Sequence, residues 1–307
     1  MRAFAEVLRA EGCTGVLVQD YEHARFDALA LLTAALRLPL YASFQGGDVT
    51  LSRLEARVRG RTLRRCRGLA VASARERARL ARTYGLGATV QDIPNPVDAA
   101  YWRAEPRAVA RVELGVPADE VLFFNHGRID IHRKGLDVLV EAWREVARRS
   151  RARLVIVGSG QDRDQFQVLL QGASGVTWIP DYVTDPPLIR RWLSAADIYV
   201  TLSRIEGMPV APLEAMACGL PVIAADAHGL IDLAAEGGVV LVPREQAESA
   251  AEAMLQLAAD PSLRQRLGRA ARATIEARYS IPTVGARLSM LARTERASGR
   301  PWPPRSR

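Results

Sequence analysis

Short apolar runs alternate with amphipathic segments from about residue 120 onward, and this alternation constrains the fold more than any other feature. The runs begin near residues 121, 153, 176, 197, 221 and 239, and helical periodicity separates most of them. Apolar runs of this kind fit strands that are buried on both faces of a parallel sheet. Ligands of such sheets bind beyond the carboxyl ends of the strands. The sequence therefore predicts a doubly wound α/β domain with its site in those loops.

The preceding residues carry the same alternation in a shorter form. Strands are predicted at 15–19, 40–44 and 69–73, and helices at 24–36, 54–65 and 74–84. Two prolines interrupt regular structure at 93–98, and residues 103–119 are predicted to link two domains. The predicted division is an α/β domain at 1–115, a larger one at 116–280, a helix at 281–296 that packs back toward the first domain, and a disordered tail at 297–307.

Hydropathy and cysteine content narrow the class of protein. No apolar run is long enough to span a membrane, and the first residues lack the apolar core of a signal peptide. The cysteines, Cys13, Cys66 and Cys218, are few and widely spaced. This pattern favours a reducing compartment over a disulfide framework or a zinc site. We therefore expect a cytoplasmic protein.

The chain is basic, with a formal net charge of +8 and a pI near 10.0. Such a charge fits nucleic acid, an anionic membrane surface or anionic substrates. No zinc-finger spacing and no aromatic-rich RNA-binding strand accompanies it, so we expect no nucleic-acid partner. The basic run at residues 57–67 allows peripheral contact with acidic lipids at the inner membrane face, although a solvated surface is the plainer interpretation.

Two carboxylates eight positions apart, Glu206 and Glu214, stand on either side of a turn that leads into a helix. Pro212 suits a helix start and places Glu214 in the first turn. The free N–H groups of that turn favour an anion, and carboxylates accept hydrogen bonds from hydroxyls. A sugar nucleotide combines both features. The alternative for the isolated pair is that both are ordinary loop and helix-start acids.

A candidate phosphate site follows the strand predicted at 121–125. Lys134 is the only lysine in the chain, and its compact charge suits phosphate. Arg128 offers a planar fork for phosphate oxygens. His126 and His132 flank this loop without a second ligand at metal spacing, so we predict surface or core histidines. A solvated basic loop is the alternative for the whole element.

The segment at 204–224 resembles the Glu-x7-Glu motif of retaining glycosyltransferases of the GT-B fold, in particular family 4 (glycosyl transferases group 1). The match extends through the run LEAMACGLPVI at 213–223. The elements at 93–98 and 127–135 occur in the family order, so the resemblance covers about residues 14–295. It implies two Rossmann-like, doubly wound parallel-sheet domains facing a cleft. The family's first strand, helix and glycine-rich loop have no counterpart, so we expect an incomplete N-terminal domain.

The resemblance implies roles for individual residues. Arg128 and Lys134 hold the donor diphosphate and stabilise the charge of the leaving nucleotide. Glu206 holds hydroxyls of the transferred sugar, and Glu214 holds the ribose hydroxyls. Glu206, Arg128 and Lys134 are thus the predicted catalytic residues. The remaining predicted substrate contacts are Gly207, Met208, Pro209, Val210, Tyr182, Val183 and Gln45.

Gln45 stands where many relatives have a histidine that approaches the transferred sugar. A glutamine donates a hydrogen bond but carries no charge. Tyr182 and Val183 are expected beside the nucleotide base. Backbone N–H groups between Gly207 and Val210 are expected to bind the sugar or the phosphate.

The implied reaction moves a sugar, with retention, from a nucleotide-diphosphate sugar to a hydroxyl of a sugar, polysaccharide or lipid-linked acceptor. It uses no cofactor and no obligatory metal, because charge stabilisation and acceptor orientation carry the chemistry. Asp162 and Asp164 resemble a metal-binding pair of another glycosyltransferase fold, but acids at a helix start more simply cap it. Two alternatives stay open: a truncated, catalytically weak sugar-nucleotide-binding protein that needs a partner, and, less favoured, a sugar-nucleotide epimerase. The base, sugar and acceptor are not specified by the sequence.

Overall fold

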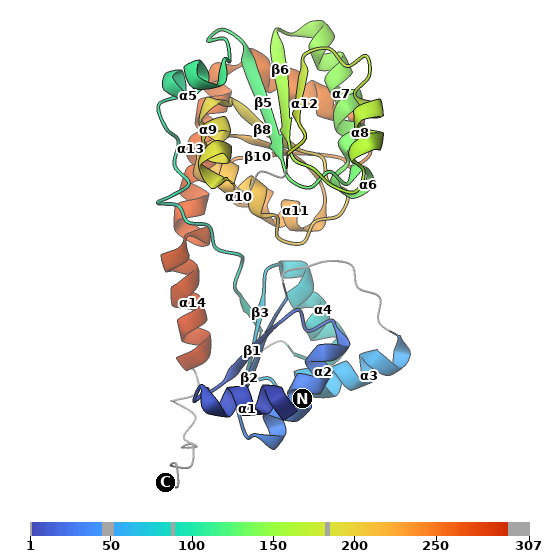
Figure 1. Ribbon diagram of the computed structural model, residues 1–307, viewed down its shortest axis with the longest axis vertical. Coiled ribbons are helices and arrows are strands. Elements are labelled where there is room, and N and C mark those ends of the chain that lie inside the picture. The colour runs from blue at the N-terminus through green and yellow to red at the C-terminus, as the bar shows by residue number, and fades with distance from the viewer. Residues whose placement is uncertain (1, 45–51, 87–89, 182–184, 294–307) are drawn as a thin grey trace. The chain divides into compact units, whose positions relative to one another are not determined.

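The computed structural model describes residues 2–44, 52–86, 90–181 and 185–293, and its contacts divide the chain into two units (Figure 1). The first unit comprises residues up to 95 together with those from 282, and the second comprises 96–281. The sequence prediction had placed the boundary after residue 115. Gln45, Tyr182, Val183 and the predicted disordered tail at 297–307 lie outside the described residues.

The first unit contains a parallel sheet with the strand order β1-β2-β3-β4. Its strands are β1 (Val16–Gln19), β2 (Leu40–Phe44), β3 (Gly68–Val71) and β4 (Val90–Asp92). Its helices are α1 (Arg2–Ala10), α2 (Ala24–Ala35), α3 (Arg53–Leu63), α4 (Ala74–Tyr84) and α14 (Ile281–Arg293). Buried apolar side chains such as Phe26, Leu69 and Leu80 form its core. Leu291 of α14 packs in a second, smaller cluster with Ala70 of β3.

The second unit is built on a parallel sheet with the order β10-β9-β8-β5-β6-β7. Its strands are β5 (Val121–His126), β6 (Ala152–Val157), β7 (Val176–Ile179), β8 (Ile198–Thr201), β9 (Val222–Ala225) and β10 (Val239–Val242). All residues of β8 and β9 are buried, as expected for strands covered on both faces. The prediction of two α/β domains with parallel sheets is confirmed, and the strand order of the second sheet is doubly wound, whereas that of the first proceeds in one direction.

Helices cover this sheet, and most follow a strand directly (Figure 1). They are α5 (Arg107–Leu114), α6 (Ile131–Lys134), α7 (Leu136–Arg149), α8 (Arg163–Leu169), α9 (Pro186–Ala195), α10 (Val210–Ala217), α11 (His228–Ala234), α12 (Ala247–Ala259) and α13 (Pro261–Thr274), with a π-helical segment at Ile275–Tyr279. Trp143 of α7 is fully buried and contacts Phe123 of β5 edge to face, with ring centroids 5.6 Å apart.

The predicted link at 103–119 is wrong in part, because α5 occupies its middle. Arg111 of α5 is 4% exposed and donates to Asp197 at 2.6 Å and to the Ala195 carbonyl at 2.9 Å. An arginine therefore occupies a buried position that an apolar residue usually takes, which hides the helical pattern in the sequence. These bonds tie α5 to the second unit.

The strand order reverses between β5 and β8. From β5 the chain proceeds outward to β6 and β7, whereas from β8 it proceeds to β9 and β10 in the opposite direction. Neighbouring loops at such a point diverge, and they leave a crevice at the carboxyl ends of the two strands. The fold thus specifies where a site in this unit is expected.

Candidate functional site

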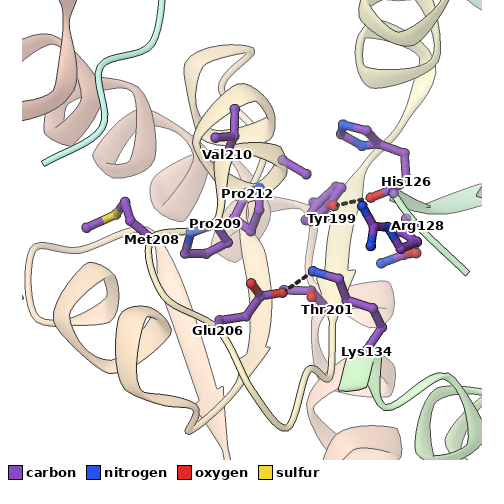
Figure 2. A pocket seen from close by; sticks show the side chains of 13 residues that line it. His126, Arg128, Lys134, Tyr199, Thr201, Glu206, Met208, Pro209, Val210 and Pro212 are labelled. Carbon is purple, nitrogen blue, oxygen red and sulfur yellow. Dashed lines mark hydrogen bonds and ion pairs between the residues drawn. The ribbon is translucent and has the colours of Figure 1, made fainter. Parts of the chain in front are cut away.

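A pocket of about 240 Å³ lies at the carboxyl ends of β5 and β8, wholly within the second unit (Figure 2). Its lining residues come from the end of β5, α6, β8 and the start of α10: Asn125, His126, Gly127, Arg128, Lys134, Tyr199, Thr201, Glu206, Met208, Pro209, Val210, Ala211 and Pro212. The sequence-predicted residues Arg128, Lys134, Glu206, Met208, Pro209 and Val210 are all among them. Gly207 and Glu214 lie beside the pocket without lining it.

The side chains of Lys134 and Glu206, which both line the pocket, point toward each other and are in contact (Figure 2). Lys134 Nζ donates to Glu206 Oε1 at 2.5 Å, and Ser203 Oγ donates to the same oxygen at 2.8 Å. The Glu206 side chain is 9% exposed and that of Lys134 is 29% exposed. The pair therefore presents an amine and a carboxylate that still reach the pocket, because neither is fully buried.

A glycine permits the two loops to meet. Gly135 follows Lys134 with a φ of 59°, in the left-handed region, and a Cβ there would lie 2.0 Å from the Leu202 carbonyl oxygen. Any larger residue would push the loop after β5 away from the loop after β8. Gly135 thus keeps Lys134 within reach of Glu206.

Arg128 supplies a second cation to the pocket. It is exposed, and its side chain makes no hydrogen bond or ion pair to the part of the chain that the structure describes. The guanidinium is therefore available for an anion, which it would bind by two parallel hydrogen bonds. Lys134 and Arg128 together make this part of the pocket positive.

Gly158 and Gly160, in the loop after β6, allow close backbone contact with the loop that carries Arg128. A Cβ at Gly158, whose φ is 150°, would lie 1.8 Å from the Gly127 carbonyl oxygen, and one at Gly160 would lie 2.1 Å from that of Ile129. The loop after β6 therefore packs directly on the loop after β5. These two glycines, a weak dinucleotide signal in the sequence, serve close backbone packing here.

Asp162 and Asp164 lie at the start of α8, as predicted, with Asp162 as the N-cap residue and Asp164 in the first turn. The Asp162 side chain makes no capping bond to α8, and its Oδ2 instead accepts a hydrogen bond from the Ile131 N–H of α6 at 2.8 Å. The acid thus stabilises the short helix that ends at Lys134. Among the described residues, no three His, Cys, Asp or Glu side chains gather closely enough to hold a metal ion.

Glu214 lies two positions deeper in its helix than predicted, because α10 begins at Val210 and not at Pro212. Its Oε2 is 2.9 Å from Nε2 of His126. The His126 side chain is 10% exposed, and its ring stacks on Phe124 with centroids 5.5 Å apart. His126 Nδ1 is buried without a hydrogen-bond partner among the described residues.

The sequence prediction of a surface or core histidine therefore missed the contact between His126 and Glu214. Its signal was the position at a strand end next to Gly127 and Arg128. What the sequence could not supply was the partner, because Glu214 is 88 residues away along the chain.

The start of α10 forms another wall of the pocket. Pro209 is the N-cap and gives the helix no side-chain hydrogen bond, so the first N–H groups remain open to a ligand. The loop that precedes this helix is held by α11, since a Cβ at Gly229 would lie 1.4 Å from the Gly207 carbonyl oxygen. Close backbone packing again fixes a segment that lines the pocket.

The basic run at 57–67 is not a uniform surface. Arg59 is fully buried and donates two hydrogen bonds, of 3.1 and 3.0 Å, to the carboxylate of Asp27. The other arginines of the run include Arg57, Arg61 and Arg65, which are exposed. Contact of this run with anionic lipid stays a prediction, which co-sedimentation with anionic and neutral vesicles would test. No helix in the described part of the chain is long and apolar enough to cross a membrane.

Part of the chain is similar to a family of known proteins. Residues 120–260 match the family described as glycosyl transferases group 1. A GDP-mannose-dependent monoacylated alpha-(1-6)-phosphatidylinositol monomannoside mannosyltransferase of Corynebacterium glutamicum is 29% identical over 228 residues, which are 71% of this chain and 59% of the relative. A D-inositol 3-phosphate glycosyltransferase of Kineococcus radiotolerans is 38% identical over 221 residues, 64% of this chain and 50% of the relative. The chain spans about half the length of the curated relatives it matches.

Solved structures share the fold. Sucrose-phosphate synthase of Thermosynechococcus elongatus has a TM-score of 0.78 at 24% identity, with 96% of this chain and 78% of that chain covered. HepE of Anabaena, solved in complex with UDP, has a TM-score of 0.81 at 18% identity, with 94% and 81% covered. These likenesses show the GT-B fold. The chain thus has the GT-B fold, and residues 120–260 of its second unit are similar to the group 1 glycosyl transferases.

Proposed function

We propose that the chain transfers a sugar, with retention of configuration, from a nucleotide-diphosphate sugar to an acceptor hydroxyl without an obligatory metal. The observation that carries this proposal is the pocket at the ends of β5 and β8, which Arg128, Lys134 and Glu206 line together. Cations for a diphosphate and a carboxylate for hydroxyls occur side by side there. A nucleotide-diphosphate sugar has the same two parts in the same order.

The diphosphate is assigned to the positive side of the pocket. Lys134 supplies a compact charge, Arg128 a fork, and the open N–H groups at the start of α10 add a partial positive charge. As the bond between the sugar and the diphosphate breaks, negative charge grows on the leaving phosphate. Cations that are already fixed around the phosphate stabilise this charge in the transition state, because they need not move when the bond breaks. This arrangement supplies the function that a metal ion has in other transferases.

The hydroxyls are assigned to the two carboxylates. Glu206 accepts hydrogen bonds from the transferred sugar, and Glu214 accepts them from the ribose, with His126 holding its other side. Each carboxylate already has a basic partner, so we assign both to binding and not to the acid and base of a hydrolase. Gly207, Met208, Pro209 and Val210 complete the donor site in this proposal.

The relatives support this class of donor. One of them is named as GDP-mannose-dependent, and HepE of Anabaena has been solved with UDP and glucose. Different bases therefore occur among similar proteins, and the diphosphate and sugar are the common part. The acceptor proposed here is a sugar, polysaccharide or lipid-linked hydroxyl.

The first experiment is a thermal-shift and calorimetry panel of UDP, GDP, ADP and their sugars on the purified chain. Lys134→Ala is expected to weaken binding of the preferred diphosphate roughly 10- to 100-fold, because a charge-assisted hydrogen bond is lost. Arg133→Ala is the matched control, since Arg133 is an exposed cation next to Lys134 that does not line the pocket. The corresponding nucleoside, which lacks phosphate, should bind both variants equally. Unchanged diphosphate affinity in Lys134→Ala would remove this lysine from the site.

Turnover separates the proposed enzyme from the alternatives. A transferase releases nucleoside diphosphate and forms a glycoside whose anomeric configuration, read by NMR, matches that of the donor. A sugar-nucleotide-binding protein would bind the donor without releasing diphosphate, and an epimerase would convert the donor without an acceptor. Activity that survives a chelator would support the metal-independent mechanism, and activity that requires added Mg²⁺ or Mn²⁺ would contradict it.

A further inference from the structure

Arg204 uses all five N–H groups of its guanidinium within one cluster. Nη1 donates to the His132 carbonyl at 2.8 Å and to Asp137 Oδ1 at 2.7 Å. Nη2 donates to Asp137 Oδ2 at 2.8 Å and to Glu245 Oε2 at 2.7 Å, and Nε donates to Glu245 Oε1 at 2.5 Å. An arginine has no further donor, and each carboxylate is held by two parallel bonds. The Arg204 side chain is 11% exposed, whereas those of Asp137 and Glu245 are 41% and 58% exposed, so the guanidinium is shielded from water and the two carboxylates are not.

These bonds join three segments that are distant in the sequence. His132 belongs to α6, Asp137 to the first turn of α7, and Glu245 to the loop after β10. The backbone N–H of Arg204 also donates to the Arg133 carbonyl at 3.0 Å. Arg204 itself lies in the loop after β8, so its side chain and its main chain both fix this loop to α6.

The position of Arg204 gives the cluster its importance. Arg204 lies two residues before Glu206. It donates hydrogen bonds to the carbonyls of His132 and Arg133, the two residues that immediately precede Lys134. Arg204 does not line the pocket. It therefore acts on the site only by fixing the segments on which Lys134 and Glu206 stand.

The charges and the backbone agree with a held arrangement. Hydrogen bonds from Arg204 hold the pKa of Glu245 below its usual value. Burial alone would raise the pKa of Asp137, but the bonds and charge of Arg204 outweigh burial and lower it. Both acids are thus ionised at neutral pH. Glu245 has a φ of 63°, a conformation that residues other than glycine rarely adopt, and the paired bonds to Arg204 stabilise it there.

We propose that Arg204 is a positioning residue that sets the separation and orientation of Lys134 and Glu206, and thereby the affinity for the diphosphate of the donor. The proposal rests on the function proposed above for that pair. Its first consequence, the geometry of the pair, needs no nucleotide to be observed.

The only lysine of the chain provides the first readout. Acylation by an amine-reactive reagent, followed by peptide mass spectrometry, measures Lys134 without interference from another lysine. In Arg204→Gln, Lys134 should react roughly threefold faster or more, because its ion pair with Glu206 loosens. Arg204→Lys keeps the positive charge but loses the paired hydrogen bonds to Asp137 and Glu245, so its Lys134 should react as fast as that of Arg204→Gln. Equal reaction rates in all forms would overturn the proposal.

Arg244→Gln is the matched control for this measurement. Arg244 adjoins Glu245 and pairs with Asp226 at 3.0 Å, with both side chains about four-tenths exposed. It does not bond to α6 or to the loop after β8, so Lys134 should react as in the unchanged chain. If Arg204→Gln fails to fold, Glu245→Gln removes one of the two carboxylates at the exposed edge of the cluster. It should give a smaller acceleration in the same direction.

A double-mutant cycle provides the second readout. Arg204→Gln should weaken binding of the preferred nucleoside diphosphate roughly tenfold when Lys134 is present, and less than about twofold in Lys134→Ala. If the loss of affinity in the double variant equals the product of the losses in the two single variants, Arg204 acts independently of Lys134, which overturns the positioning role. If the unchanged chain binds no diphosphate, the proposed function fails, while the acylation rates still decide whether Arg204 controls the Lys134–Glu206 pair.

Discussion

Single residues in the second unit owe their placement to backbone contacts that only glycine permits. Gly135 meets the Leu202 carbonyl, Gly158 meets Gly127, and Gly229 meets Gly207. Each contact joins a segment that lines the pocket to a neighbouring segment. The distance between charged pocket residues such as Lys134 and Glu206 therefore depends on these glycines as well as on the charged residues themselves.

Gly229→Ala tests this dependence. The added Cβ would overlap the Gly207 carbonyl, so the loop before α10 must move, and we expect a loss of roughly 1–3 kcal/mol of stability together with weaker nucleotide binding. Urea unfolding and calorimetry measure the two effects. Gly285→Ala in α14 is the control, because a Cβ at that position would meet no other atom within 4 Å and alanine favours a helix. A Gly229→Ala chain as stable as the control would show that the loop adapts without cost.

At the level of elements, α5 is attached to the sheet by buried charge. Asp197 is 2% exposed on its side chain and accepts bonds from Arg111 at 2.6 Å and from the Leu122 N–H at 2.8 Å. Arg107 forms a further ion pair with it at 2.5 Å. The acid therefore joins α5, β5 and the start of β8.

Asp197→Ala should destabilise the second unit by about 3–5 kcal/mol, because it leaves the buried Arg111 without its partner. Asp119→Ala removes an exposed pair with Arg151 and should cost less than about 1 kcal/mol. Chemical denaturation followed by far-UV circular dichroism compares the two. Similar costs would mean that water reaches Arg111 after the substitution.

The same elements show what the sequence could predict. The strand at 40–44 and the helix at 74–84 agree residue for residue with the structure, because apolar periodicity and clear end signals coincide there. Where that pattern weakens, elements were missed. Arg111 hides the apolar face of α5, and α12 is rich in alanine, whose small side chain gives little contrast between faces.

The candidate site was predicted in part for the same reason. Lys134 and Glu206 were identified as single residues, by composition and by family resemblance. Their contact depends on β5 and β8 being neighbours in the sheet, and the order of strands along the chain does not reveal that. The pairing of His126 with Glu214 and the cluster around Arg204 depend on the same strand order. The resemblance thus assigned these residues to one donor, but the direct contacts between their side chains were not accessible from the sequence.

The whole molecule carries one buried thiol in the core of each unit. Burial raises the pKa of Cys66 in the first unit and of Cys218 in the second to about 12 each. Only the thiolate reacts with alkylating reagents, so both should be inert at pH 8 while folded and reactive once unfolded. Cys13 is half-buried and serves as an internal reference.

Alkylation at rising temperature should therefore report the unfolding of each unit separately. The preferred nucleoside diphosphate, at about 100 times its Kd, should stabilise the second unit by roughly 2.7 kcal/mol and delay labelling of Cys218. Labelling of Cys66 should be unchanged. Equal delays at both cysteines would show that the two units unfold together.

The neighbouring position of β5 and β8 also determines when the pocket can form. Asn125 of β5 donates to the carbonyl of Val200 in β8, 75 residues later in the chain. During synthesis, one edge of β5 has no partner until β8 has left the ribosome, and such non-local pairing is slow. An unpaired edge strand is prone to join other chains. The pocket can therefore form only after the segments that separate its two strands, and the start of α10, have been made.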